Sequence, residues 1–162
     1  MNATDAFRHQ LEMGRHQLTE MVKGFSQSDW LTAPVTNGNF PLWNVAHLAF
    51  SEARGLNVRI RGGENPLEHW TDMFGQGSKP VEGGPGYPSH EEIWDEFLTR
   101  RKDLLEFVAT QSDTDLDQST NIDHPMFNTV GKTLATLSFH QFFHIGQIAD
   151  TRRKLGKEPV LA

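Results

Sequence analysis

Apolar side chains recur at helical spacing in four separate segments, over about residues 4–23, 41–60, 89–110 and 129–155. Each segment begins or ends at a residue typical of a helix boundary. Pro41 suits a first turn because its missing N–H would be unpaired there, and Ser89 begins a capping box with Glu92. Gly24 and Gly156 follow the first and last segments, where glycine commonly ends a helix. The pattern predicts four long helices, and no strand pattern competes with it.

The segments differ in how their apolar residues are distributed. In residues 4–23 and 89–110 these residues form one stripe, so that one side of each helix faces a core. In residues 41–60 they cover more than one face, which indicates deep burial or a partner surface. Residues 62–88 interrupt the pattern with seven glycines and four prolines, although Leu67, Trp70, Met73 and Phe74 could pack a helical turn onto the bundle. A connection of this length suggests a crossover that could cover a pocket.

The predicted fold is all-α, a four-helix bundle formed by residues 1–162 as one domain. A chain of 162 residues is long enough to bury a substantial core without disulfides or other staples. The long connection between the second and third helices allows these two to run parallel. The sequence therefore predicts an up-down-down-up topology.

Composition and charge exclude several classes of function. The formal net charge of −6 disfavours nucleic-acid binding, which depends on clustered Lys and Arg. Because there are no cysteines, a metal must be held by histidines, carboxylates or carbonyls. Ten acidic residues within residues 91–123 are expected to form a solvated helix face and an acidic loop. No segment resembles a signal peptide or a membrane span, so we expect a cytoplasmic protein.

Three histidines lie in the apolar segments that should be buried. His140 and His144 are four residues apart, so on a helix their rings share one face. Burying two imidazoles without partners costs on the order of 1–3 kcal/mol each, and one metal ion would supply a partner for both. His47 adds a third ligand if its helix faces theirs, and bundle cores do hold metal sites of this kind. The alternative is that all three are hydrogen-bonded core residues.

Four further residues are candidates for the surroundings of such a site. Asn44 and Gln147 each lie one turn from a histidine and could orient a ring or a substrate, or simply satisfy buried backbone groups. Gln141 stands where HExxH metalloproteases have their general base, and an amide cannot take up a proton, which disfavours that class. Arg54 is expected to form a structural ion pair, with an anionic substrate group as the alternative.

The remaining histidines and aromatic residues are weaker candidates. His69 or His124 could line a pocket, whereas the first-helix histidines, His9 and His16, are expected at the surface and His90 in a helix cap. Three aromatic residues could line the metal site or could simply belong to the core, namely Trp43, Trp70 and Phe74.

Two motifs carry a resemblance to a known family: PLWNVAHLA at residues 41–49 and SFHQFFHIGQI at residues 138–148. In these motifs, and in helix order over nearly the whole chain, the sequence resembles the DinB/YfiT-like superfamily. The resemblance implies an up-down-down-up four-helix bundle, a homodimer, and a zinc, nickel or similar divalent ion held by His47, His140 and His144. Characterised members include transferases and isomerases that use low-molecular-weight thiols such as bacillithiol or mycothiol. The family name implies no DNA binding.

The leading hypothesis for function is a metal-dependent enzyme of thiol S-transferase or hydrolase type that acts on a small molecule. Three neutral ligands leave the ion its full charge, which lowers the pKa of a bound water or thiol. No residue of the sequence stands out as a general base. The alternative is a non-catalytic metal- or ligand-binding bundle of a stress response, in which the ion is structural. Imidazole suits zinc, nickel, copper and iron alike, so the residues do not select the metal.

Overall fold

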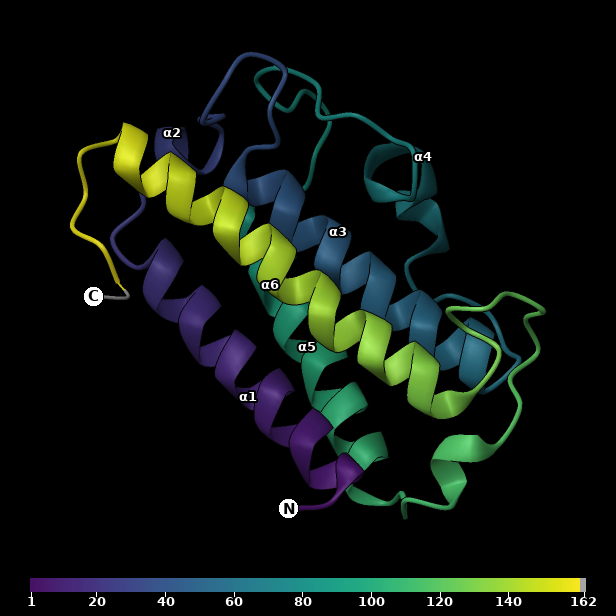
Figure 1. The fold of residues 1–162 in the computed structure, drawn as a ribbon. Coiled ribbons are helices and arrows are strands. Elements are labelled where there is room, and N and C mark those ends of the chain that lie inside the picture. The colour runs from purple at the N-terminus through teal and green to yellow at the C-terminus, as the bar shows by residue number, and fades with distance from the viewer. Residues whose placement is uncertain (161–162) are drawn as a thin grey trace.

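The computed structural model describes residues 1–160, and four long helices dominate it (Figure 1). They are α1 (Ala3–Val22), α3 (Pro41–Ala53), α5 (His90–Ala109) and α6 (Val130–Lys154). Their ends lie within one or two residues of the predicted ones, apart from the end of α3. Residues 161–162 of the predicted domain lie outside the described part of the chain. No strand occurs in residues 1–160, which confirms the all-α prediction.

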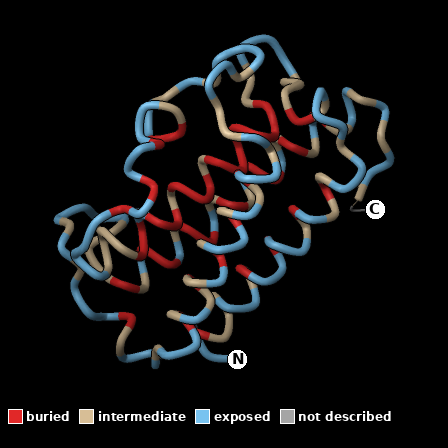
Figure 2. Tube along the Cα trace, turned by 180° about the vertical axis from the view of Figure 1, so that it is seen from behind, coloured by how far each residue is buried: buried red, intermediate tan, exposed pale blue. Residues whose placement is uncertain are grey.

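The long helices form a ring in which each one packs against two others. α1 and α3 lie diagonally opposite each other, and both contact α5 and α6. α1 and α6 run in one direction and α3 and α5 in the other, as Figure 1 shows. The topology is therefore up-down-down-up, as the long crossover predicted. Buried residues lie on the inward sides of these helices, and the connecting loops are largely exposed (Figure 2).

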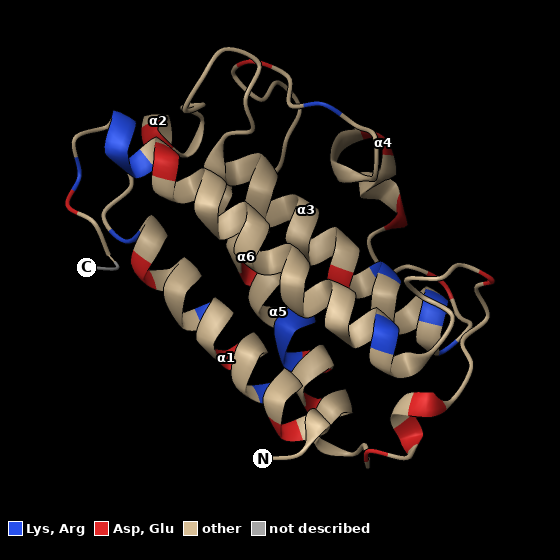
Figure 3. Ribbon diagram, viewed as in Figure 1, with Lys and Arg blue, Asp and Glu red and all other residues tan. Residues whose placement is uncertain are grey.

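Charged side chains are distributed over the surface much as the sequence predicted. None of the ten acidic residues between residues 91 and 123 is buried. Basic side chains gather where the chain continues beyond the end of α3 (Figure 3). Of the helices in residues 1–160, none has both the length and the apolar character needed to span a membrane.

α3 is buried on almost every side. Of its thirteen residues only His47 and Ser51 are not fully buried, which confirms the expectation of deep burial. The helix does continue to residue 60, but Arg54–Ile60 form a π-helix, η1, with i→i+5 hydrogen bonds. The predicted helical segment therefore extends to residue 60 as expected, with π-helical hydrogen bonds over its last seven residues. Seven residues are too few for apolar spacing to distinguish the two helix types.

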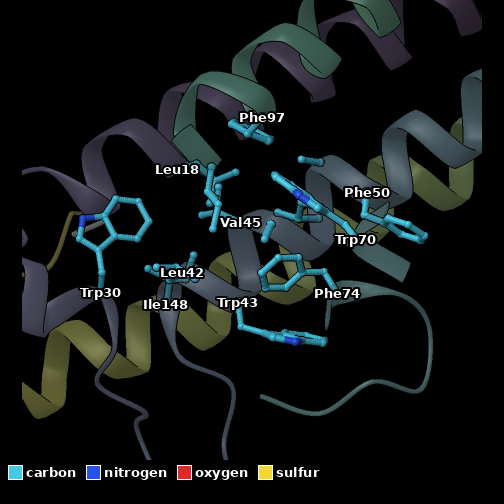
Figure 4. Packing of buried hydrophobic residues seen from close by; sticks show 14 of the residues in the cluster. Leu18, Trp30, Leu42, Trp43, Val45, Phe50, Trp70, Phe74, Phe97 and Ile148 are labelled. Carbon is cyan, nitrogen blue, oxygen red and sulfur yellow. The ribbon is translucent and has the colours of Figure 1, made fainter. Parts of the chain in front are cut away.

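The crossover between α3 and α5 packs a helical turn onto the bundle, as predicted. Its short helices are η2 (Glu68–Trp70) and α4 (Thr71–Phe74). Leu67, Trp70 and Phe74 are buried there. Phe74 lies between Trp43 of α3 and Trp70 (Figure 4), and the ring centroids of Phe74 and Trp70 are 5.3 Å apart. This turn is a fixed part of the core beside α3.

Two short helices were not predicted, and one of them is the 3₁₀ turn η3 (Asp115–Asp117) in the acidic loop before α6. α2 (Gln27–Trp30) follows α1 and is started by a capping box between Ser26 and Asp29. Its last residue, Trp30, is buried and stacks on His90 with ring centroids 5.4 Å apart. The capping pattern is visible in the sequence, but four residues are too few to show an apolar period.

A buried ion pair joins α3 to α5. The side chains of Arg101 and Glu52 are 0% and 2% exposed. Nε of Arg101 donates to one carboxylate oxygen of Glu52 at 3.0 Å, and a second guanidinium nitrogen donates to the other. Nη1 of Arg101 donates to the backbone carbonyl of Leu11 in α1 at 2.5 Å. One guanidinium therefore links three of the four long helices.

Candidate metal centre

The ring of His47 is held in one orientation from two sides. One turn earlier in α3, Trp43 stacks on it, with ring centroids 4.8 Å apart and planes 8° from parallel. On the other side, Nδ1 of His47 lies 2.6 Å from the backbone carbonyl oxygen of Phe74. Because a carbonyl oxygen only accepts, Nδ1 must carry the proton. Nε2 of His47 is then left with a free lone pair, which is what a metal ligand requires.

His144 is oriented in the same way by two amide side chains. Its Nδ1 lies 2.8 Å from Oδ1 of Asn44 and 3.2 Å from Oε1 of Gln147. Asn39 supports both amides: its Nδ2 donates to Oε1 of Gln147 at 3.2 Å, and its carbonyl oxygen accepts from Nδ2 of Asn44 at 3.5 Å. Nδ1 of His144 therefore donates, and Nε2 faces the other histidines. The structure assigns Asn44 and Gln147 the ring-orienting contacts for which the sequence made them candidates.

The three imidazoles converge although they come from two helices. His140 lies one turn before His144 on α6, and the two Nε2 atoms are 3.0 Å apart. The centroid of the His47 ring is 5.0 Å from that of His140 and 5.1 Å from that of His144. One ring nitrogen from each residue lies within 4.8 Å of those from the other two. The predicted faces of α3 and α6 do meet.

The donor set fits a divalent transition-metal ion. Two imidazole nitrogens bound to one tetrahedral zinc ion at 2.0–2.1 Å stand about 3.3 Å apart, close to the spacing of His140 and His144. His47 and His144 cannot hydrogen-bond to each other through Nε2, because a neutral imidazole whose Nδ1 donates has only an acceptor at Nε2. A cation would satisfy both of these lone pairs, and that of His140 in the same tautomer, at once.

Burial keeps the three rings neutral at physiological pH. It lowers the pKa of His140 to about 4, with smaller contributions from the charges of His47 and Arg59. It lowers the pKa of His144 to about 3, again helped by the two neighbouring histidines. The pKa of His47 is also lowered by burial, against the opposing effect of its contact with Phe74. Protons therefore do not compete with a metal for these nitrogens near pH 7.

A cavity of about 560 Å³ opens beside two of the histidines, His47 and His140. α3, η1, the crossover just after α4, the loop before α6 and α6 itself all contribute to its wall. One side is apolar, with Phe50 and Leu137 among its residues, and another is basic. No Asp or Glu from residues 1–160 lines it. A small molecule could reach the histidines here without meeting a carboxylate.

Gln141 lies outside this site. Its side chain is fully buried and points to α1, where its Nε2 donates to the carbonyl oxygen of Gln10 at 3.0 Å. It packs against Gly14, at which a Cβ atom would stand 1.9 Å from Oε1 of Gln141. A glutamate at position 141 would therefore also point away from the three histidines. The geometry gives a further reason why HExxH-type chemistry does not apply.

The other candidates divide between the cavity and the surface. His124 lines the cavity, His69 is exposed elsewhere, and His9 and His16 are exposed as expected. Arg54 lines the cavity, and among residues 1–160 it has no carboxylate within ion-pair distance, so the expected ion pair is not formed.

The aromatic candidates turn out to serve both purposes. Trp43 and Phe74 contact His47 and also belong to the main core, whereas Trp70 reaches the site only through Phe74. The sequence did not point to Asn39, Arg59 or the Phe74 carbonyl. Asn39 and Arg59 follow no helical spacing from a histidine, and a backbone group leaves no trace in a sequence pattern.

Comparison with known proteins places the chain in a structural context. A family model described as the DinB superfamily matches residues 10–148. A conserved protein from Enterococcus faecalis has a similar crystal structure, with a TM-score of 0.72 and 16% identity over 97% of this chain and 99% of that one. YfiT from Bacillus subtilis, described as a probable metal-dependent hydrolase with an unusual four-helix bundle topology, gives a TM-score of 0.67 and 17% identity over 96% and 89%. Comparison with curated proteins gives no match. At these identities the two structures bear on the fold.

Proposed function

The chain belongs to the DinB superfamily, and from that premise we propose that it is a metal-dependent enzyme whose ligands are His47, His140 and His144. The observation that carries the proposal is the convergence of three ring nitrogens within 4.8 Å, with the opposite nitrogens of His47 and His144 bound to oxygen acceptors. Such second contacts fix the tautomer and the ring direction, and metal-binding histidines almost always have them. Zinc and nickel both suit this donor set.

A divalent cation held by three neutral imidazoles would lower the pKa of a coordinated thiol or water and so supply a nucleophile at neutral pH. The chain contributes the position of that nucleophile and the cavity in which it meets a substrate. His47 and His140 form part of the cavity wall, so a group bound between them would face the cavity. Trp43 covers one face of the His47 ring, and Phe50 and Leu137 give the cavity wall apolar surface.

The reaction class follows from what the cavity offers for proton transfer. Hydrolysis needs a group that removes protons from water and returns one to the leaving group. No carboxylate from residues 1–160 lines the cavity, and two of its histidines, His47 and His140, would be occupied as ligands. The third, His124, accepts a hydrogen bond at Nδ1 from the backbone N–H of Met126 at 3.2 Å, so its lone pair is already engaged. A thiol, once ionised, attacks an electrophile without a further base. Among the two expected activities, S-transfer from a low-molecular-weight thiol is therefore favoured over hydrolysis of a small molecule.

Metal content tests the ligand assignment. Untagged protein, wild type and with His47→Ala, His140→Ala or His144→Ala, would be measured by mass spectrometry after growth with zinc and nickel. We expect about one ion per chain in the wild type and a large loss in each variant. His124→Ala is the matched control, because His124 lines the same cavity outside the three ligands. An equal loss in that control, or a wild type that neither holds metal nor gains melting temperature with zinc or nickel, would rule out the site.

Activity is tested on the metal-loaded protein. Bacillithiol, mycothiol, cysteine and glutathione would each be combined with a chromogenic electrophile, and a chromogenic ester would report hydrolysis. S-transfer that disappears in His140→Ala and persists in His124→Ala supports the proposal. Hydrolysis of the ester without any S-transfer would reverse the preference between the two reactions.

The second candidate is a bundle in which the ion is structural or ligand-binding but not catalytic. The lack of a carboxylate from residues 1–160 in the cavity wall favours it, since histidines are then the only acids or bases that these residues place in the wall. It predicts that metal-loaded protein is inert with every thiol and ester. It also predicts that His140→Ala lowers the melting temperature steeply, because a ligand at 100 times its Kd stabilises a fold by about 2.7 kcal/mol.

A further inference from the structure

Two arginines line the cavity beside the histidines without an acidic partner. Both Arg54 and Arg59 belong to its wall, and within residues 1–160 neither lies within ion-pair distance of a carboxylate. The guanidinium of Arg59 lies over the ring of Phe127, with Cζ 3.5 Å from the ring centroid. This contact holds the group in place and offers no negative charge. The two charges are therefore available to a ligand.

The π-helix explains why both arginines reach one cavity. In an α-helix, residues five apart are rotated by about 140° from each other and face different directions. In η1, hydrogen bonds run from residue i to residue i+5, so Arg54 and Arg59 lie one turn apart on a common side. Short π-helical turns are frequent at functional sites. Here the change of helix type aims two cations at the space that the histidines border.

The arginines act electrically on each other and on the histidines. Burial, followed by the charge of Arg54, lowers the pKa of Arg59. The charge of Arg59 is among the causes that lower the pKa of His140. Two like charges held close together without a counter-ion are unfavourable, and Arg59 is half-buried, which weakens the screening by water. An anion bound between them would remove this cost.

We propose that this cavity binds a small organic anion, whose carboxylate or phosphate group is held by Arg54 and Arg59. Guanidinium groups match both anions because their planar N–H donors bind two oxygens at once. The apolar body of the ligand packs against Phe50 and Leu137, and its other end lies toward His47 and His140. In the proposed function the end near the histidines is the reacting one, and that part of the assignment rests on the proposed function. The assignment deepens that function by defining the class of substrate or thiol cofactor as anionic.

Direct binding tests the assignment without any reaction. Full-length untagged protein, treated with EDTA and kept in a buffer of low ionic strength, would be titrated calorimetrically with benzoate, phenyl phosphate and the neutral benzyl alcohol. The wild type should bind at least one of the anions at least tenfold more tightly than the alcohol. Arg54→Gln and Arg59→Gln should each weaken that binding by about tenfold, the usual value of a charge-assisted hydrogen bond. The anion that binds more tightly shows whether the site prefers a carboxylate or a phosphate.

Arg61→Gln is the matched control. Arg61 directly follows η1 but lies outside this cavity, and its Nη1 donates to Oδ1 of Asn57 at 3.2 Å. Its loss should leave the affinity unchanged. The proposal is overturned if the wild type binds neither anion, if Arg54→Gln retains wild-type affinity, or if Arg61→Gln weakens binding as much. Arg54 is exposed, so its variant should fold even if the Arg59 variant does not.

The two proposals fail in different measurements. The titration contains no divalent ion, so the arginines are tested whether or not the histidines bind metal. Absence of metal from the wild-type protein would refute the proposed function and would not affect the proposal that the arginines bind an anion. Unchanged anion affinity in Arg54→Gln, with metal bound normally, would sink the assignment of the arginines alone.

Discussion

Acidification of the metal-free protein should remove a large and calculable part of its stability. In the folded state the pKa of His140 is about 4 and that of His144 is about 3, because both rings are buried. In the unfolded chain each imidazole titrates near 6.5. Between these values the unfolded state binds protons that the folded state does not. The contribution of these two histidines to the free energy of unfolding is therefore fully present above about pH 6.5 and is lost as the pH decreases toward 4.

The size of this loss of stability at pH 5 depends mainly on the pKa of the imidazoles in the unfolded state. One pKa unit corresponds to about 1.4 kcal/mol, and pH 5 lies 1.5 units below 6.5, so each ring that stays neutral in the folded state costs about 2 kcal/mol. His140 and His144 together should lower the free energy of unfolding by about 4 kcal/mol between pH 7 and pH 5. That is a large part of the 5–15 kcal/mol typical of a folded domain.

Urea unfolding at pH 7 and pH 5, in the presence of EDTA, measures this loss. The control is the double variant His140→Gln, His144→Gln, which keeps polar side chains of moderate size and cannot titrate. Contributions from all other groups appear in both proteins and cancel in the comparison. The pH-dependent loss should be about 4 kcal/mol smaller in the variant. Equal losses in the two proteins would show that these histidines are protonated in the folded state, and the account of their burial would be wrong.

Three further predictions concern buried contacts, two in the core of the bundle and one at the site. Gly14→Ala should lower the free energy of unfolding, measured by thermal melting, by about 1–2 kcal/mol, because its Cβ would overlap the buried side chain of Gln141. Gly146→Ala is the control: a Cβ there meets nothing within 4 Å, so the change should raise the free energy of unfolding by up to about 1 kcal/mol. Arg101→Met should cost about 3–5 kcal/mol in urea unfolding by leaving a buried carboxylate unpaired, and adding Glu52→Leu should restore most of that loss. Asn44→Leu should weaken zinc affinity by about 10- to 100-fold in calorimetric titration, and a change below about threefold would refute its role in orienting the ring.

Most of the fold could be predicted from local patterns. Apolar spacing, Ser89 and the glycines after α1 and α6 define helices whose ends agree with the structure within two residues. The long crossover led to the correct topology, because a short link would have forced α3 and α5 to run antiparallel. α2 and η1 could not be predicted, since four and seven residues are too few to establish a period. Helix type at this length depends on tertiary contacts.

The buried pair of Arg101 and Glu52 marks a second limit of sequence patterns. Arg101 stands among other charged residues of its helix, so nothing local distinguishes it from an exposed charge. Glu52 is the one acidic residue of a segment expected to be deeply buried, but the pattern does not name its partner. Their pairing depends on a contact between residues 49 positions apart. Three-dimensional packing alone decides which charges are buried.

In the candidate site, too, the residues on one helix face could be predicted and the contacts between distant segments could not. The sequence identified the three histidines, and also Asn44 and Gln147, because residues on one helix face repeat at a known spacing. It could not identify the carbonyl of Phe74, which reaches His47 across 27 residues of chain. It also favoured an ion pair for Arg54, which has no carboxylate from residues 1–160 within ion-pair distance. Residues brought together by the crossover and by η1 were beyond local reasoning.

The charge of the cavity unites these features in one functional argument. The chain as a whole carries a formal net charge of −6, yet the wall of this cavity contains two arginines and, from residues 1–160, no carboxylate. A divalent ion held by three neutral histidines would add its full charge to that of the arginines. A thiolate, a carboxylate or a phosphate is stabilised in such surroundings, whereas a cation is repelled. The same field that lowers the pKa of a bound nucleophile would therefore also select an anionic ligand, so metal loading should strengthen binding of benzoate or phenyl phosphate beyond the affinity measured for the metal-free protein.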